Sequence, residues 1–552
     1  MLLGIDVGGT FTDAVLIEDG KVVNYAKYAT TYPNVLAGIL GALDKVLLKI
    51  NIEKIERVTI SSTIVTNSLL ENKTDKVLLV VMPGPGINVE KKFPVKPYII
   101  KGYVDHRGKV LSEPVFSESR ILQESKVTKN AVVSGKFSVR NQSNERKLRK
   151  FLIDFGFKKI YCGADMSSEL NFIRRTNSAC FSAMVANVFE TFVKQVKLSL
   201  TKRKINVPIQ ILKADGFSLP IDKVYEKPVE AVFTGPAASV LGIEALGVSN
   251  KKAISLDVGG TTTDIAFWED GRPLQSKKGI KIDKYFTSVQ GFFMKSVGIG
   301  GDSLLRRSEK FTVGPDRIGP AMALGGNKPT LTDALLLLGL IDYGDKKKAK
   351  LGFLDLVKDG ETVLEIAEKF VNIAVLKLKD AIDNMIEELS LQPVYEVNDI
   401  FNSKRFKPKV LIGVGGGSLG LIKELGKVME IDTIIPTGAI VANAIGAAVA
   451  KITLEATLRV DTTEGYYTIN DGNIKQKCSS GFDLKEAKKV LGEFLLSKAN
   501  EVKITNPKLE VKALEEFFTI HDYLSTGKII NLKMQVKSGD LNSVVCKEAS
   551  FK

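Results

Sequence analysis

A ten-residue pattern occurs twice in this chain, and it constrains the fold more than any other feature. One copy, GIDVGGTFTD, begins at Gly4, and the other, SLDVGGTTTD, begins at Ser255. Aligning residues 6–21 with 257–272 gives ten identities in sixteen positions. A strand-like apolar run stands on both sides of each copy, and Glu-Asp-Gly supplies a closing turn. The repeat therefore predicts two copies of one β-hairpin, each with a glycine-rich bend.

Such a hairpin is suited to binding a polyphosphate. Adjacent glycines lack the Cβ atoms that keep backbone N–H groups away from phosphate oxygens, and a threonine hydroxyl adds a donor. We expect the two hairpins to face each other and to hold the β- and γ-phosphates of ATP. The candidate phosphate-binding residues are Gly8, Gly9, Thr10, Thr12, Gly259, Gly260, Thr261 and Thr263.

The aspartate that precedes each glycine pair is the candidate catalytic and metal-binding residue. Asp6 and Asp257 would hold Mg²⁺ through water, and one of them would position a nucleophile. The alternative is that both aspartates cap turns. Asp13 and Asp264 follow seven residues later and either support this site or stabilise the hairpin.

A third glycine cluster, KVLIGVGGGSLG (409–420), predicts a buried strand, a turn and an amphipathic helix. A glycine turn before a helix lets adenosine lie against bare backbone and offers N–H donors to the α-phosphate. The candidate adenosine-binding residues are Gly415, Gly416, Gly417 and Ser418. The alternative is a tight connection without a ligand. No GxxxxGK[ST] and no complete GxGxxG after a strand occurs, so a P-loop and a dinucleotide fold are not expected.

Two further turns are candidates for contacting nucleotide or substrate. GIGGDS (298–303) contributes Gly300, Gly301 and Asp302, of which Asp302 would orient a substrate or adenosine hydroxyl. VDHRG (104–108) contains His106 between Asp105 and Arg107, a combination suited to an anionic or amide substrate. Structural turns are the alternative at both places.

Composition excludes several other classes of protein. The net charge of +15 comes from scattered lysines, which favours a solvated surface over a nucleic-acid or membrane partner. Two histidines disfavour a Ser/His/Asp triad and a multi-histidine metal site. Four cysteines without paired spacing fit a reducing cytoplasm. The longest apolar run, 439–450, is too short to span a bilayer, and no secretory signal is expected.

The order of the motifs DxGGT, DxGGT and GGGS, followed by a helix of small residues, resembles the actin-like ATPase superfamily of sugar kinases, Hsp70 and actin. Within it the chain resembles the hydantoinase A/5-oxoprolinase family, which includes N-methylhydantoinase A and the ATP-binding subunits of acetone-type carboxylases. The segments that carry this resemblance are TIVTNSLLE (63–71), DGFSLP (215–220), KPVEAVFTGPAASVLG (227–242), LDVGGTTTDIA (256–266), VGIGGDSL (297–304), VGPDRIGP (313–320) and GGNKPTLTDALLLLG (325–339).

This resemblance implies an α/β, two-lobed actin-like ATPase fold made of duplicated ribonuclease H-like domains, with an inserted subdomain and a short C-terminal extension. We expect the first lobe at 1–205 with the insertion at 77–165, the second lobe at 206–456, and the extension at 457–552. Helices are predicted near 33–50, 63–71 and 167–203, and a helix at 439–456 is expected to cross back to the first lobe.

The same resemblance implies an ATP-dependent hydrolase with ATP and Mg²⁺ as cofactors. It would phosphorylate the amide oxygen of a small cyclic amide for ring opening, together with a hydantoinase B-like second subunit and with homo-oligomers possible. Two alternatives remain open: the ATP-binding subunit of an acetone-type ketone carboxylase, and a nucleotide-driven reactivating chaperone. The chain departs from the family pattern at GVGGGSLG, at Asp302 and beyond residue 460, where it is shorter than expected.

Overall fold

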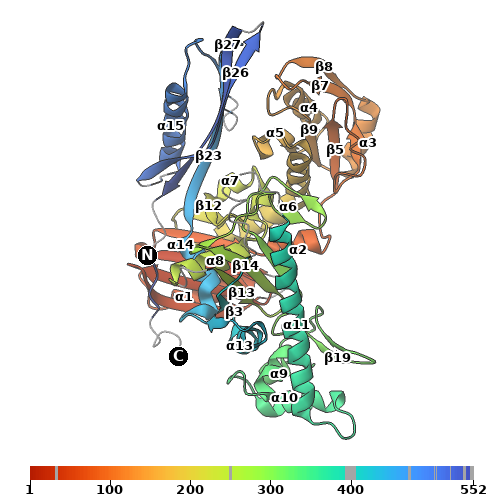
Figure 1. Ribbon diagram of the computed structural model, residues 1–552, viewed down its shortest axis with the longest axis vertical. Coiled ribbons are helices and arrows are strands. Elements are labelled where there is room, and N and C mark those ends of the chain that lie inside the picture. The colour runs from red at the N-terminus through yellow and green to blue at the C-terminus, as the bar shows by residue number, and fades with distance from the viewer. Residues whose placement is uncertain are drawn as a thin grey trace.

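The computed structural model describes residues 1–30, 35–247, 252–391, 406–469, 474–502, 504, 506–521, 524–538 and 543–546. Two central sheets carry the predicted hairpins, a smaller parallel sheet lies to one side, and a long antiparallel layer extends from the other (Figure 1).

The first sheet begins with the first predicted hairpin. Its strand order is β3-β2-β1-β4-β11-β12, in which β1 pairs antiparallel with β2 and parallel with β4. The strand bounds are β1 (Leu2–Val7), β2 (Phe11–Glu18), β3 (Lys21–Ala29), β4 (Arg57–Ser62), β11 (Ile209–Leu212) and β12 (Phe217–Pro220). Because β11 and β12 pair within this sheet, the sheet continues past the lobe boundary predicted at residue 205.

The second sheet repeats this topology. Its order is β15-β14-β13-β21-β22, with an antiparallel hairpin followed by two parallel strands, and β18 also pairs with β14. The bounds are β13 (Ala253–Val258), β14 (Thr263–Glu269), β15 (Arg272–Pro273), β18 (Met294–Val297), β21 (Val410–Val414) and β22 (Asp432–Ile434). The repeated topology confirms the predicted α/β fold with two actin-like lobes.

Two helices of small residues pack against the first sheet where the lobes meet. They are α8 (Thr234–Ala245) and α14 (Ala442–Val449). A Cβ on Gly446 would lie 1.8 Å from the carbonyl oxygen of Ala238, and one on Gly4 would lie 2.1 Å from that of Ala444. Glycine is therefore required for this close packing.

The helix predicted at 439–456 is shorter than expected. Residues Ala439–Val441 form a 3-10 turn, α14 ends at Val449, and strand β23 (Lys451–Asp461) follows. From Lys451 the chain pairs with β12 and with β27 (Leu524–Ser538), and these sheet hydrogen bonds replace helical ones. The predicted return to the first lobe is nevertheless observed, because α14 packs on β1.

A separate four-stranded parallel sheet lies within the range predicted for the insertion. Its order is β10-β9-β5-β6, and the long helix α6 packs on β9. Asn171 caps α6 by accepting a hydrogen bond from the backbone N–H of Arg174. The bounds are β5 (Val77–Met82), β6 (Pro97–Ile99), β7 (Lys101–Val104), β8 (Val110–Val115), β9 (Asn130–Gly135), β10 (Lys159–Cys162), α3 (Glu118–Val127), α4 (Ser143–Asp154), α5 (Gly163–Met166) and α6 (Phe172–Lys202).

The C-terminal residues form an antiparallel layer that shares β23 with the first sheet. A capping box of Asp483 and Glu486 begins its helix α15, which packs on β23 and β27. The remaining bounds of this layer are β24 (Tyr466–Ile469), β25 (Ile474–Lys477), α15 (Leu484–Glu501), β26 (Pro507–His521) and β27 (Leu524–Ser538).

Further helices complete the two lobes, and α9, α10 and α11 form the lower part of Figure 1. Their bounds, with the remaining strands, are α1 (Val35–Val46), α2 (Ile64–Leu70), α7 (Ile221–Val224), β16 (Lys281–Ile282), β17 (Tyr285–Phe286), β19 (Leu305–Arg307), β20 (Phe311–Val313), α9 (Leu331–Leu337), α10 (Lys346–Phe353), α11 (Val363–Ser390) and α13 (Ser418–Met429).

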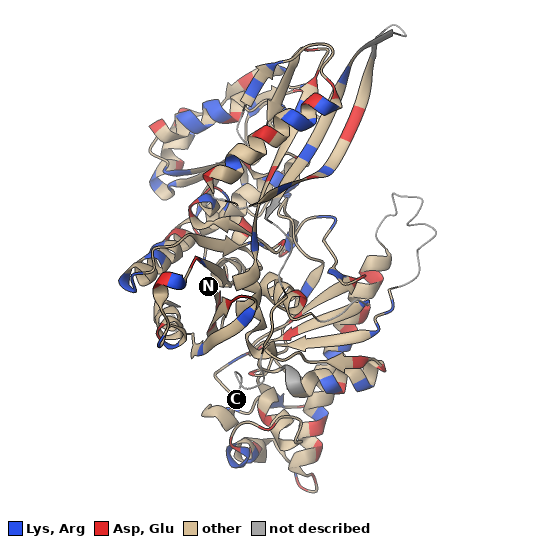
Figure 2. Cartoon of the chain, turned by 90° about the vertical axis from the view of Figure 1, so that its left-hand side faces the viewer, with Lys and Arg blue, Asp and Glu red and all other residues tan. Residues whose placement is uncertain are grey.

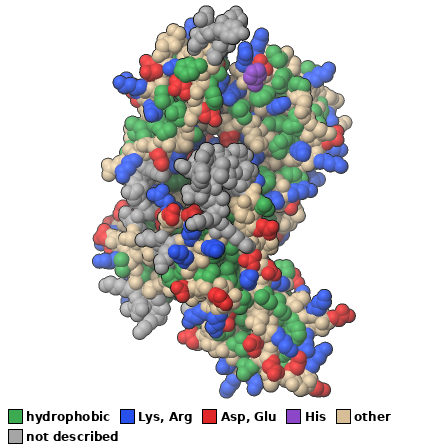
Figure 3. Space-filling view, viewed as in Figure 1, with side chains coloured by type: hydrophobic (Ala, Val, Ile, Leu, Met, Phe, Trp, Pro, Cys, Tyr) green, Lys and Arg blue, Asp and Glu red, His purple; other side chains and the backbone are tan. Residues whose placement is uncertain are grey.

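Charged residues are dispersed over the molecule. Lys and Arg alternate with Asp and Glu along the helices and strands seen in Figure 2, and Figure 3 shows a similar mixture on the face of Figure 1. None of the helices in the described ranges combines the length and hydropathy needed to cross a bilayer.

Candidate active site

A cavity of about 1190 Å³ lies where the two hairpins meet. Both glycine bends line it, together with the loop before α13 and the helices α2, α6 and α14. Residues that are distant in the sequence therefore converge on one space.

The two hairpins have the same local geometry. The backbone N–H of Gly8 donates to the carbonyl oxygen of Phe11 at 3.0 Å, and the N–H of Gly259 donates to that of Thr262 at 2.9 Å. The bends also come close to each other, because a Cβ on Gly260 would lie 2.8 Å from Thr10 Oγ1. Gly8, Gly9, Thr10, Gly259, Gly260 and Thr261 all line the cavity.

The two candidate catalytic aspartates lie in the cavity and are almost fully buried. Asp6 is 5% exposed and Asp257 is 8% exposed. The hydroxyl of Ser61 donates to Asp6 Oδ1, and Asn443 Nδ2 donates to Asp257 Oδ2 at 2.8 Å. Burial raises the pKa of Asp6 to about 7, with further contributions from the charges of Asp13 and Asp257. Burial likewise raises the pKa of Asp257.

The second aspartate of each hairpin lines the same cavity. Asp13 pairs with Asp6 in the strand register, and Asp264 pairs with Asp257. Lys27 Nζ donates to both carboxylate oxygens of Asp13, at 2.8 and 2.6 Å. Burial and the charge of Asp257 raise the pKa of Asp264 to about 7. The four aspartates of the two hairpins therefore line one cavity.

The third glycine cluster forms another wall. Gly415 has a φ of +88°, and a Cβ there would lie 2.5 Å from Asp257 Oδ1, so only glycine fits. The N–H of Gly417 donates to the carbonyl oxygen of Val258 at 3.1 Å. Gly416 has open space around its Cβ position, and Tyr343 donates to its carbonyl oxygen at 3.0 Å. Ser418 begins α13, but its side chain lies outside the described residues.

The segment 300–302 supports the second hairpin from behind. Gly301 and Asp302 donate their N–H groups to the carbonyl oxygens of Gly259 and Gly260, at 2.9 and 2.7 Å. Gly300 packs on Gly260 and does not line the cavity, whereas Gly301 and Asp302 do. The Asp302 carboxylate forms an ion pair with Arg317 at 3.0 Å.

Two predicted phosphate-binding threonines do not reach the cavity. Thr12 and Thr263 are fully buried. The hydroxyl of Thr12 interacts with that of Thr30 at 3.1 Å, and the hydroxyl of Thr263 donates to the carbonyl oxygen of Ile299 at 2.7 Å. Because side chains alternate along a strand, Thr12 and Thr263 point away from the face that Asp13 and Asp264 present.

The turn with His106 lies outside the cavity as well. Residues 105–109 connect β7 to β8, and Asp105 Oδ1 accepts hydrogen bonds from the N–H groups of Arg107 and Lys109, both at 2.9 Å. The turn is thus closed on itself, as the structural alternative predicts, and its residues do not line the cavity.

Several residues that line the cavity or bind its aspartates were not among the predicted site residues. Ser61 lies in β4 next to Asp6, and Asn443 is the one polar residue in α14, which in retrospect is a signal. Helices α2 and α6 contribute Asn67, Ser68, Asn187, Thr191 and Gln195 to the cavity. Asn67 and Ser68 belong to the segment TIVTNSLLE (63–71), whereas no local motif marks the residues from α6.

Comparisons with known proteins agree with this geometry. A family model described as hydantoinase/oxoprolinase matches residues 175–456, and one for the hydantoinase/oxoprolinase N-terminal region matches residues 2–155. The caprolactamase subunit alpha of Pseudomonas jessenii is 24% identical over 79% of this chain and 68% of its own length.

Other relatives are matched over a smaller share. The acetophenone carboxylase gamma subunit of Aromatoleum aromaticum is 26% identical over 62% of this chain, and the 5-oxoprolinase of Saccharomyces cerevisiae is 24% identical over 61%. The match spans 53% of the former protein and 31% of the latter. This chain thus corresponds to only part of these relatives.

Two solved structures share the fold over nearly the whole chain. A nucleotide-free acetone carboxylase gives a TM-score of 0.73 at 17% identity, and the Pseudomonas jessenii ATP-dependent caprolactamase gives 0.68 at 20%. Each alignment covers 98% of this chain and 88% of the other.

Proposed function

Because the chain belongs to the hydantoinase/oxoprolinase family, we propose that it is an ATP-dependent enzyme that activates a small cyclic amide for ring opening. The observation that carries this proposal is the meeting of two glycine hairpins and four carboxylates in one cavity. Relatives named caprolactamase and 5-oxoprolinase support a lactam as the substrate.

The hairpins would bind the phosphates of ATP. In this proposal Gly8, Gly9 and Thr10 approach them from one side and Gly259, Gly260 and Thr261 from the other, because all six line the cavity. The adenosine would lie against Gly415, Gly416 and Gly417. Gly416 suits this role because nothing lies within 4 Å of its Cβ position.

The aspartates suit a hydrated Mg²⁺. Among the described residues no Lys or Arg forms an ion pair with Asp6 or Asp257, although both carboxylates are buried. The described residues also contain no group of three or more His, Cys, Asp or Glu placed to hold a metal ion. Mg²⁺ commonly keeps several waters and uses one or two carboxylates plus phosphate oxygens, which fits this arrangement. When bound, it would neutralise charge on the β- and γ-phosphates.

The chemical step would be transfer of the γ-phosphoryl group to the amide oxygen. A bond forms between that oxygen and the γ-phosphorus, and the bond from this phosphorus to the β–γ bridging oxygen breaks, which releases ADP. Water then attacks the activated carbon, and the ring C–N bond breaks as the nitrogen takes up a proton. The acyl phosphate formed in this way is hydrolysed by a second water to a carboxylate and phosphate. In this scheme the protein contributes by positioning and by charge stabilisation, with one of the two aspartates orienting the amide.

A second subunit is part of the proposal. Two relatives are named as subunits, the caprolactamase subunit alpha and the acetophenone carboxylase gamma subunit. We propose that a hydantoinase B-like subunit carries out the hydrolytic half.

The free state of all four cysteines supports a cytoplasmic location.

A ketone carboxylase subunit is the second candidate. The acetophenone carboxylase gamma subunit, at 26% identity, favours it. The same cavity would then activate a ketone or bicarbonate instead of an amide. Release of ADP that requires bicarbonate together with a ketone would identify this function.

The experiment is a measurement of ADP release with lactams and hydantoins, with and without the second subunit. We expect at least one cyclic amide to raise the rate, and we expect the Asp257→Asn variant to abolish the increase. Failure of every cyclic amide with both preparations would contradict the proposed function.

A further inference from the structure

The cavity continues beyond the hairpins to an end formed by two helices. This α2–α6 end consists of Ile64, Asn67 and Ser68 on α2 and Val188, Thr191 and Gln195 on α6. It adjoins the first hairpin directly, because the N–H of Thr63 before α2 donates to the carbonyl oxygen of Val7 at 3.1 Å. The hydrogen bond from Tyr343 to Gly416 lies at the third glycine cluster, where the proposed adenosine would bind, and not at the α2–α6 end.

The α2–α6 end consists of uncharged groups. Asn67 and Gln195 carry amides, Ser68 and Thr191 carry hydroxyls, and Ile64 and Val188 are apolar. Amide and hydroxyl groups both donate and accept hydrogen bonds, so they match the C=O and N–H of a neutral amide. The apolar pair suits the methylene groups of a ring.

The cationic side chains that line the described cavity are already bound to carboxylates. Lys27 Nζ lies 2.6 Å from Asp13 Oδ2, and Arg317 Nε lies 3.0 Å from Asp302 Oδ2. Lys73 Nζ lies 2.6 Å from Glu71 Oε2. Each positive charge in the lining is thereby compensated within the protein.

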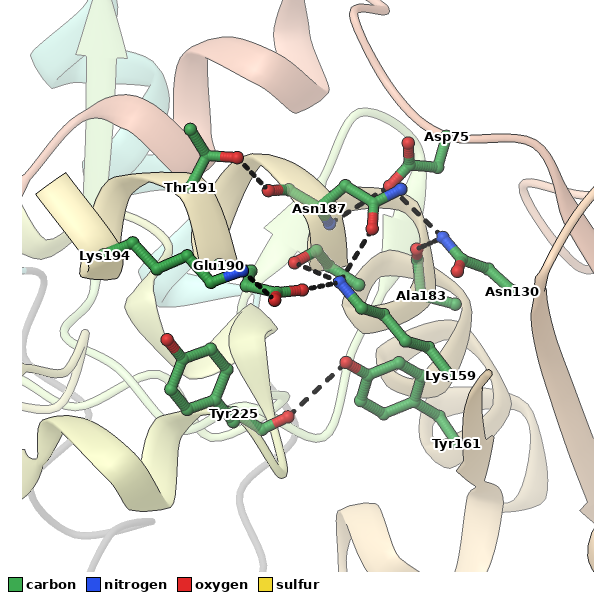
Figure 4. Close-up of polar contacts among 11 residues, drawn as sticks. Asp75, Asn130, Lys159, Tyr161, Ala183, Asn187, Glu190, Thr191, Lys194 and Tyr225 are labelled. Carbon is green, nitrogen blue, oxygen red and sulfur yellow. Dashed lines mark hydrogen bonds and ion pairs between the residues drawn. The ribbon is translucent and has the colours of Figure 1, made fainter. Parts of the chain in front are cut away.

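The lysines just outside the α2–α6 end are also engaged (Figure 4). Glu190 on α6 forms ion pairs with Lys159 at 2.5 Å and with Lys194 at 2.6 Å. These two lysines hold the pKa of Glu190 at about 2. Lys159 Nζ also donates to Asn187 Oδ1 at 2.7 Å and to the carbonyl oxygen of Ala186 at 3.2 Å. Lys159 and Lys194 thus share one carboxylate, and each already has an anionic partner.

We propose that the α2–α6 end binds the substrate of the proposed reaction and selects an uncharged lactam over one that carries a carboxylate. This inference rests on the proposed function. A carboxylate would lose water without gaining a cation of its own, because the cations that line the described cavity already pair with carboxylates of the protein. The predicted substrates are simple lactams and related neutral cyclic amides.

The test compares two lactams with the same five-membered ring, 2-pyrrolidinone and 5-oxoproline, which differ by one carboxylate. ADP release is measured over a range of each lactam, with the second subunit present. Binding of each lactam to the full chain with ATP and Mg²⁺ is followed by saturation-transfer NMR. We expect kcat/KM for 2-pyrrolidinone to exceed that for 5-oxoproline by about tenfold or more.

A charge added at the α2–α6 end sharpens this test. Thr191 is exposed on α6, so Thr191→Lys adds a cation without disturbing the core. We expect this variant to raise the ratio of kcat/KM for 5-oxoproline to kcat/KM for 2-pyrrolidinone about threefold, since exposed ion pairs contribute modestly. Thr201→Lys is the matched control, because Thr201 is exposed on the same helix but lies outside the cavity lining.

The outcomes separate the two proposals. If 5-oxoproline binds and reacts as well as 2-pyrrolidinone, the inference about charge is wrong while the proposed function stands. If both lactams bind weakly and equally, the inference is also wrong. If no cyclic amide raises ADP release, the proposed function itself fails.

Discussion

The two hairpins have the same backbone geometry but differ in the residues that surround them. Thr30, immediately after β3, supports the first hairpin: its N–H donates to the carbonyl oxygen of Thr10 at 2.8 Å, and its hydroxyl to that of Gly8 at 3.0 Å. The second hairpin is supported by segments that are distant in the sequence, through Gly301, Asp302 and Gly417. The first bend thus depends on its own sheet, whereas the second is coupled to the third glycine cluster, Gly415 to Gly417.

The two equivalent aspartates differ in the same way. Asp6 receives its hydrogen bond from Ser61 on the neighbouring strand of its own sheet. Asp257 lies opposite Val414 on the neighbouring strand and receives its hydrogen bond from Asn443 on α14. The repeated residues therefore give both hairpins the same geometry. The residues outside the repeat, Ser61 and Asn443, hold the two aspartates in different ways.

Replacing each of the two aspartates with asparagine shows whether both hairpins take part in the reaction. We expect Asp6→Asn and Asp257→Asn each to lower kcat for ATP hydrolysis by about 100-fold or more, because each removes a charge from the phosphate site. Steady-state ADP release measures both variants. Full activity in either variant would show that its hairpin does not take part in the reaction.

The equivalent glycines at the bends should respond unequally to alanine. Nothing lies within 4 Å of a Cβ on Gly9, whereas a Cβ on Gly260 would lie 2.7 Å from Asp302 Oδ2 and 2.8 Å from Thr10 Oγ1. We expect Gly260→Ala to weaken ATP binding about tenfold, and Gly9→Ala to weaken it less, since backbone strain and collisions raise the free energy. Calorimetric titration of both variants checks this. Equal losses of ATP affinity in the two variants would contradict the difference in space around the two glycines.

The two hydrogen-bond donors should shift the pH profile to different extents. Ser61 lowers the pKa of Asp6, and Asn443 lowers the pKa of both Asp6 and Asp257. Removing a donor to a carboxylate raises its pKa, so the acid limb of kcat should move to higher pH. We expect a larger shift, about one pH unit, for Asn443→Ala than for Ser61→Ala. If Asn443→Ala left the pH profile of kcat unchanged, this result would contradict the role of Asn443 as a donor shared by Asp6 and Asp257.

The smallest effect concerns stability without nucleotide. Burial raises the pKa of Asp6 and Asp264 to about 7, above the usual 3.8, so the folded protein binds these protons more tightly than the unfolded chain. Their contribution to stability is therefore present at low pH and is lost as pH rises from about 4 to about 7. At pH 8 we expect Asp6→Asn to raise the melting temperature by about 2 °C.

Asp19→Asn is the control for that measurement, because Asp19 is exposed in the turn that links β2 to β3. Its melting temperature should equal that of the unmodified protein at each pH. A destabilised Asp6→Asn protein at pH 8 would contradict the sign of the effect.

The sequence predicted those parts of the site that depend on local pattern. The hairpins, their aspartates and Gly415 to Gly417 lie where glycine pairs and apolar runs placed them, because turns and strands are short-range features. Thr12 and Thr263, which the motif predicts to bind phosphate, are buried and do not line the cavity, because a motif does not state which face of the strand is buried. Ser61, Asn443 and the α2–α6 end depend on contacts between distant segments, which no local pattern records.

Hydrogen exchange with a non-hydrolysable ATP analogue and Mg²⁺ tests most directly whether the two hairpins hold one nucleotide. The backbone N–H groups of both bends should exchange more slowly when the analogue binds, because they donate to phosphate oxygens or lie beside them. The prediction is protection of both 6–12 and 257–263. Protection of one hairpin alone, or of neither, would contradict the shared site.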